Sequence, residues 1–146
     1  MSKIAKEAKV IADSWSNLNA AFASGKTKSY AWRYAQLGAL KVFLKDHENS
    51  LKEALNADLG RHPFEAIGLD LLGCMVELDY IMKNLKTWMK PTYTEVPLWM
   101  TPASSEIVYE PFGTVLVLGP FNYPVSLTVS FTRYVYVDLH LVIYCK

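Results

Sequence analysis

A short stretch late in the chain combines a buried-strand pattern with side chains that can bind a ligand. Val115–Leu118 is an uninterrupted apolar run, which is typical of a strand covered on both faces in a parallel sheet. Gly119 and Pro120 end the run, because proline cannot donate to a β-ladder and glycine tolerates unusual backbone angles. Two aromatic residues, an amide and a second proline come next: Phe121, Asn122, Tyr123 and Pro124. Groups just beyond the carboxyl end of such a strand lie where open α/β sheets bind ligands.

These residues also have ordinary structural interpretations. An Asn after Gly-Pro is commonly a turn residue whose side chain bonds its own backbone. Phe121 and Tyr123 are core aromatics by default. A chemical role for Asn122 therefore depends on what the rest of the chain resembles.

The composition describes one globular domain. A chain of 146 residues with 51% hydrophobic and 20% charged residues can enclose a core and is not typical of a disordered protein. The formal net charge of +1 gives no basic footprint for a nucleic acid. The amino terminus lacks the apolar core of a secretory signal, and no apolar run could span a bilayer. We therefore expect a cytoplasmic location.

Cysteines and histidines predict no metal site. The two cysteines, Cys74 and Cys145, have no metal or redox spacing and are consistent with a reducing compartment. Cys74 falls on an apolar helical stripe, so we expect a buried, inert thiol. The histidines have no ligand spacing either: His47, His62 and His140.

Residues 1–90 predict a helical region. The first helix covers residues 1–24 and carries one apolar stripe: Ile4, Ala8, Ile11, Trp15, Leu18 and Phe22. We expect this stripe to pack within its own subunit, and docking on a second subunit is the alternative.

Three further helices are expected in this region, and each has a predicted buried side. The second covers Thr27–His47; its predicted buried residues are Trp32, Gln36, Ala39, Leu40, Phe43 and Leu44, and its predicted solvent side includes Arg33 and Lys41. The third ends at Leu59-Gly60, and the fourth runs from Pro63 to Lys90. The fourth has an apolar stripe of Phe64, Ile67, Leu71, Cys74, Leu78, Ile81, Leu85 and Trp88, and a solvated acidic face of Glu65, Asp70, Glu77 and Asp79.

The remainder predicts the beginning of a sheet, so the expected fold class is α/β. Residues 91–105 read as an extended connector rich in proline. Residues 106–127 hold the first strands, one of them near Ser105–Tyr109, and the turn that bears Asn122. Residues 128–146 form a divergent tail.

Several blocks of sequence together resemble the amino-terminal part of an aldehyde dehydrogenase of the class 3, or fatty-aldehyde, type. In chain order they read SGKTKSYAWRYAQLGAL, ADLGRHPFEA, LKTWMKP and PASSEIVYEPFG followed by the apolar strand and GPFNYP. The resemblance covers roughly Trp15 to Leu127. It implies a Rossmann-like domain and an oxidoreductase that converts an aldehyde to a carboxylic acid with NAD or NADP.

The resemblance also implies roles for the turn. In that family a cysteine thiolate attacks the aldehyde, and an amide donates to the resulting oxyanion; a preorganised donor of this kind is worth roughly 3–4 kcal/mol. By resemblance Asn122 is that donor, and Tyr123 lies toward the substrate. The residues implied on the nicotinamide side are Leu118, Gly119, Pro120 and Phe121, the last replacing the family's usual Trp.

The tail departs from the family pattern after Leu127. Apolar and polar residues alternate from Tyr134 to Tyr144, which predicts a strand where the family has a helix. We interpret the change as a truncation, through an altered reading frame, or as a genuine short form. The family's cysteine, its glutamate and most of its dinucleotide-binding sheet lie beyond the matched segment, so we expect this chain to be inactive alone.

Two other functions stay open at this point. The chain could be a non-catalytic module that docks on a full-length homologue or forms a homo-oligomer. It could also be an unrelated small helical protein, in which case Val115–Leu118 would be helical.

Overall fold

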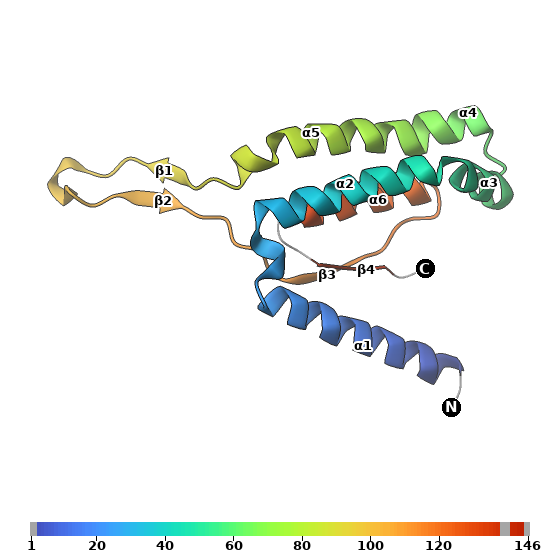
Figure 1. The fold of residues 1–146 in the computed structure, drawn as a ribbon, viewed down its shortest axis with the longest axis horizontal. Helices are drawn as coiled ribbons and strands as arrows, with labels where there is room; N and C mark the ends of the chain where they lie inside the picture. Colours follow the sequence, from blue (N-terminus) through green and yellow to red (C-terminus); the bar gives the residue numbers. More distant parts are fainter. Residues whose placement is uncertain (1–2, 138–140, 145–146) are drawn as a thin grey trace.

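The computed structural model describes residues 3–137 and 141–144 and has a helical part followed by short strands (Figure 1). The elements of the first part are α1 (Lys3–Ala23), η1 (Lys26–Lys28), α2 (Tyr30–Asp46), α3 (Glu48–Leu59), α4 (Pro63–Glu65), η2 (Ala66–Leu72) and α5 (Gly73–Trp88). The later elements are β1 (Thr92–Thr94), η3 (Leu98–Met100), β2 (Ser105–Ile107), β3 (Thr114–Val117), α6 (Pro124–Val137) and β4 (Leu141–Tyr144). The α/β class predicted from the sequence is confirmed.

Local signals in the segment Leu59–Pro63 set the boundary between α3 and the next helix. Gly60 has a φ of +64° and ends α3, because its N–H bonds back to the Asn56 carbonyl and the next N–H to the Leu55 carbonyl. Pro63 then occupies the first position of α4. The helix continues from α4 through the π-helical η2 into α5 and so covers the predicted fourth helix.

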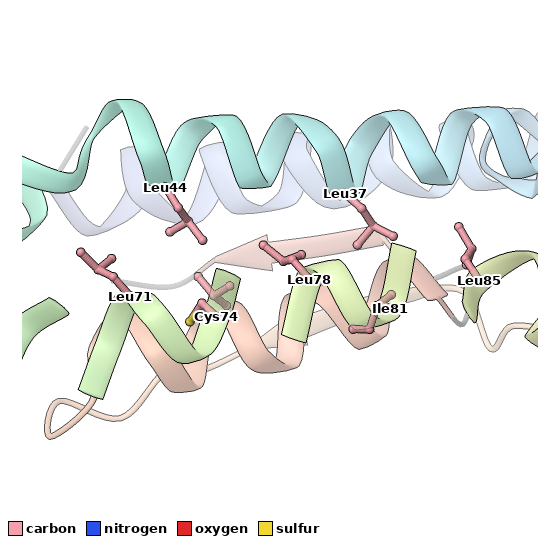
Figure 2. Close-up of a cluster of buried hydrophobic side chains, with 8 residues drawn as sticks. Leu37, Leu44, Leu71, Cys74, Leu78, Ile81 and Leu85 are labelled. Atoms are coloured by element: carbon pink, nitrogen blue, oxygen red, sulfur yellow. The ribbon is translucent and has the colours of Figure 1, made fainter. Parts of the chain in front are cut away.

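The hydrophobic core lies where α2, η2, α5 and α6 meet. Figure 2 shows Leu37 and Leu44 of α2 pointing toward the side chains of η2 and α5. The buried cluster comprises Leu37, Leu44, Leu71, Cys74, Leu78, Ile81, Leu85 and Val129. The apolar stripe predicted for the fourth helix is therefore confirmed over its middle. Its two ends are wrong, because Phe64 is 79% exposed and Trp88 is 40% exposed.

Two charged residues that were predicted to face solvent are buried. Arg33 is 5% exposed and its Nε donates to the Thr27 carbonyl oxygen at 3.4 Å. Asp70 is fully buried. On α2 the buried face is centred on Leu37, and the predicted core residue Phe43 is exposed. The buried residues Arg33, Leu37 and Leu44 also have helical spacing, but the charge of the arginine makes this stripe hard to recognise from apolar residues alone.

Among the described residues, the predicted packing of the α1 stripe within the subunit holds only toward the carboxyl end of the helix, where Leu18 and Phe22 are half-buried. α1 extends away from the helical layer and lies against β3 (Figure 1). Its stripe residues Ile11 and Trp15 are 48% and 46% exposed. The attachment is near its carboxyl end, where the Thr114 hydroxyl donates to the Asn19 side-chain oxygen at 2.7 Å.

The strands form two separate pairs. β1 and β2 are antiparallel, with Thr92 opposite Ile107, so the predicted extended connector is largely a β-hairpin. β3 and β4 are parallel and α6 makes the crossover between them. Val117 is buried but Leu116 is 49% exposed, so β3 is not covered on both faces by the described residues, contrary to prediction.

α6 replaces part of the strand predicted for the tail. The helix extends to Val137, and Leu141–Tyr144 is a strand paired with β3. Val125 and Val129 pack on the core. Burying such a side chain is worth about 1.5–3 kcal/mol, whereas a poor helix former costs at most about 0.7 kcal/mol, so packing outweighs the β-preference of this segment.

Truncating the core at α5 gives a test of this packing. Replacing Ile81, which is 2% exposed, by Val is expected to lower the free energy of unfolding by about 0.5–1.5 kcal/mol. The same change at Ile107, which is 48% exposed on β2, is the matched control and should change it by less than about 0.5 kcal/mol. Urea unfolding of both variants measures the difference; equal losses would contradict the assigned core.

Candidate functional site

The predicted site residues form the turn between β3 and α6. β3 ends at Val117 and α6 begins at Pro124, so the turn lies at the carboxyl end of a parallel strand, where ligand sites in α/β sheets occur. Leu118 and Phe121 are 66% and 83% exposed. The strand conformation of β3 contradicts the interpretation as an unrelated helical protein, which required a helix here.

Asn122 is exposed and its side chain is available to a ligand. Among the described residues no hydrogen bond involves its side-chain amide, whereas its main-chain carbonyl accepts a bond from Arg61. The alternative interpretation, in which the amide bonds its own backbone as a turn residue, is therefore not observed. The amide N–H can point at a partner outside this chain segment.

Arg61 connects the turn to the helical part. One guanidinium nitrogen, Nη2, donates to the Asn122 carbonyl oxygen at 2.7 Å, while Nη1 pairs with a carboxylate oxygen of Asp70. The guanidinium carbon lies 4.7 Å from the centre of the Tyr123 ring, within the range of a cation–π contact. Tyr123, which was predicted to lie toward the substrate, is half-buried beside Arg61.

Asp70 holds the start of α6 through its second carboxylate oxygen. Oδ1 accepts the Ser126 N–H at 3.0 Å, and the Tyr123 carbonyl accepts the first helical bond, from Leu127, at 3.0 Å. Tyr123 is thus the N-cap residue, but its side chain has no acceptor placed to cap the helix. The buried carboxylate supplies from η2 the acceptor that an N-cap Ser or Asp would usually provide.

Sequence reasoning did not identify Arg61 or Asp70 as site residues. A signal was present, because Asp70 lies three residues after Ile67 and four before Cys74, both on the apolar stripe. An acid at that spacing is more consistent with burial than with a solvated face. Cys74 is buried as predicted, and its thiol donates to the Asp70 carbonyl oxygen at 3.0 Å.

The residues implied on the nicotinamide side are partly exposed at the turn. Leu118 and Phe121 expose apolar side chains next to Gly119, which has none. There is also no room for a side chain at Gly119, because an added Cβ would lie 1.8 Å from the Thr128 Oγ1 of α6. The backbone of the turn therefore approaches α6 closely.

This close approach predicts the effect of an alanine at position 119. Gly119→Ala is expected to lower the free energy of unfolding by about 1–3 kcal/mol, as overpacking usually does. Thr128→Ala removes the obstructing side chain and is the matched background. In that background the same glycine substitution should recover most of the loss in a urea unfolding experiment; an equal loss in both backgrounds would contradict the contact.

Other features of the described residues lie apart from the turn. Residues 3–137 and 141–144 contain no group of three His, Cys, Asp or Glu side chains placed to hold a metal ion; His140 and Cys145 lie outside these residues. None of the helices in this part of the chain is both long and apolar enough to cross a membrane. An apolar groove of about 490 Å³ runs between α2, α3 and α6, but neither Gly119 nor Asn122 lines it.

Comparison with known proteins identifies the class that this fold and turn define. The profile of the aldehyde dehydrogenase family matches residues 4–132, so the chain belongs to the aldehyde dehydrogenase family. The match extends past Leu127, which corrects the predicted end of the resemblance. Thr132, the last matched residue, lies within α6.

Within the family the chain is similar to family 3 members. It is 40% identical over 111 residues to aldehyde dehydrogenase family 3 comG of Dictyostelium discoideum and 41% identical over 112 residues to family 3 member B3 of Mus musculus. These alignments cover 76% and 77% of this chain but 24% and 23% of the relatives. The chain thus spans about a quarter of the length of the curated relatives it matches.

Solved structures show the same fold. The substrate-bound state of Staphylococcus aureus AldH superposes with a TM-score of 0.89 at 31% identity, over 92% of this chain and 29% of that one. Succinic semialdehyde dehydrogenase of Streptococcus pyogenes, solved with NADP⁺, gives a TM-score of 0.78 at 18% identity over 92% of this chain and 29% of that one. The second likeness concerns the fold alone.

Proposed function

We propose that this chain supplies the amino-terminal part of an NAD(P)-dependent aldehyde dehydrogenase, in which Asn122 is the amide donor to the substrate oxyanion. The observation that carries the proposal is the exposed Asn122 side chain, unengaged by the described residues, in the turn that follows β3. Its main-chain carbonyl is fixed by Arg61. A donor held in place before the reaction stabilises developing charge without reorganisation.

The proposed chemistry assigns separate tasks to neighbouring residues. The Asn122 amide donates to the oxygen that gains negative charge when a thiolate, from a segment beyond the matched residues, adds to the aldehyde carbon. Asn brings no charge of its own, so it does not oppose the departure of a hydride. Leu118, Gly119, Pro120 and Phe121 provide the apolar surface beside a nicotinamide ring, which when bound accepts that hydride. Tyr123 borders the substrate side of the turn. Whether the cofactor is NAD or NADP depends on segments beyond these residues.

A completed chain tests the proposal. Residues 1–132 are joined in frame to the segment that follows the matched region in the Dictyostelium relative; we refer to this protein as the completed chain. Aldehyde-dependent formation of NAD(P)H is expected from the completed chain and not from the 146-residue chain alone. A folded completed chain without turnover would contradict the proposal, and turnover by the 146-residue chain would contradict the predicted inactivity.

A non-catalytic role as an interaction module is the second candidate. It is favoured by apolar side chains that are largely exposed to solvent, among them Trp15 on α1 and Trp99 in the hairpin, which are 46% and 82% exposed. Such a module would pair with itself or with a full-length homologue. Sedimentation of the purified chain, alone and mixed with that homologue, separates the two; a monomer that leaves the homologue unchanged would remove this candidate. The cytoplasmic location stays a prediction.

A further inference from the structure

We propose that Arg61 and Asp70 are positioning residues that fix the backbone at Asn122 and at the start of the helix that follows it. This inference rests on the proposed role of Asn122 and deepens it by naming the groups that hold the amide at the strand exit. Arg61 acts on Asn122 itself through the carbonyl oxygen, and Asp70 acts four residues later through the Ser126 N–H. Neither residue touches the side-chain amide, which stays exposed.

The two backbone contacts form one unit because the Arg61–Asp70 ion pair joins the side chains that make them. The Arg61 side chain is 12% exposed and that of Asp70 is fully buried, so each charge depends on the other for compensation. The same guanidinium donates to both Asp70 and the Asn122 carbonyl, which uses the planar fork that a lysine lacks. The Tyr123 ring also packs against the guanidinium, whose carbon lies 4.7 Å from the ring centre.

The backbone segments that carry Arg61 and Asp70 are themselves held in place. Gly60 ends α3 in a left-handed conformation, so Arg61 leaves the helix at a fixed angle. Its own carbonyl accepts a bond from the Asn56 side chain at 3.0 Å. Asp70 is held on a continuous helix within the core. The turn that carries Asn122 is therefore fixed to rigid elements at two points rather than by its own residues.

Arg61→Lys separates positioning from stability in the 146-residue chain. An ammonium can keep the pair with Asp70 but cannot also hold the Asn122 carbonyl in the same geometry. Because this variant keeps a positive charge opposite Asp70, we expect the urea midpoint to stay within about 0.5 M of the parent chain. The NMR order parameters of the Asn122 and Tyr123 N–H groups should fall from about 0.85 to below about 0.6.

Arg33→Lys, the same substitution at a buried arginine of α2, is the control and should leave both order parameters unchanged. The double variant Arg61→Gln with Asp70→Asn removes both charges together, so it leaves no unpaired buried charge and should show the same mobile turn. Order parameters that stay at the parent value in both Arg61 variants would overturn the inference. Because loop order is measured in the chain itself, this result is independent of whether the completed chain oxidises aldehydes.

Discussion

Replacing Asp70 by Asn is expected to lower the free energy of unfolding of the chain by about 3–5 kcal/mol, measured by urea unfolding at 25 °C. The carboxylate is fully buried, pairs with Arg61 and accepts the Ser126 N–H. An amide of the same shape keeps the packing but leaves the guanidinium without a compensating charge. The start of α6 also loses a charged acceptor.

Asp79→Asn is the matched control for this change. Asp79 lies on the same helical run and pairs with Lys41, but its side chain is 60% exposed and the Lys41 side chain 35%. Solvent screens such a pair, so a change of no more than about 1 kcal/mol is expected. Similar losses at Asp70 and Asp79 would mean that burial of the Arg61–Asp70 pair is not what makes it important.

Replacing Asn122 by Ala in the completed chain is expected to lower kcat by about 10²–10³-fold, as loss of a single oxyanion donor does in other enzymes. The KM for the aldehyde should change little, because the amide acts on charge that develops only after the substrate is bound. Steady-state kinetics with NAD(P)H absorbance measures both constants.

Asn49→Ala, at an exposed residue in the first turn of α3, is the control for Asn122→Ala and should leave kcat unchanged. A rise in KM at unchanged kcat after Asn122→Ala would indicate ordinary ground-state binding. That outcome would be incompatible with an oxyanion donor.

Patterns of local sequence predicted the helices and their ends well, because glycine and proline act on the backbone directly. Gly60 and Pro63 mark a helix end and a helix start where the sequence predicted them. The strand at Val115 and the turn after it followed from the same kind of signal. The burial of charged residues could not be predicted from local signals, since Arg33 and Asp70 are compensated by partners distant in the chain or in another element.

The tail and the site geometry depend on tertiary contacts that no local pattern contains. The β-formers after Leu127 predicted a strand, but packing of Val129 on the core favours a helix through Val137. For the site, the sequence identified Asn122 by resemblance but not Arg61 and Asp70, which contact the backbone of its turn. Asp70 lies at helical spacing within the apolar stripe, but the groups that compensate its charge, Arg61 and the Ser126 N–H, come from other segments of the chain.

The most direct measurement of the central claim is the kcat of the completed chain with Asp in place of Asn122, compared with Ala at the same position. If the side chain faces an oxygen that becomes negative, an ionised carboxylate repels that charge, and kcat should fall below the value for the alanine variant. A kcat for the aspartate variant equal to or above that of the alanine variant, in a protein that folds normally, would contradict the role assigned to Asn122.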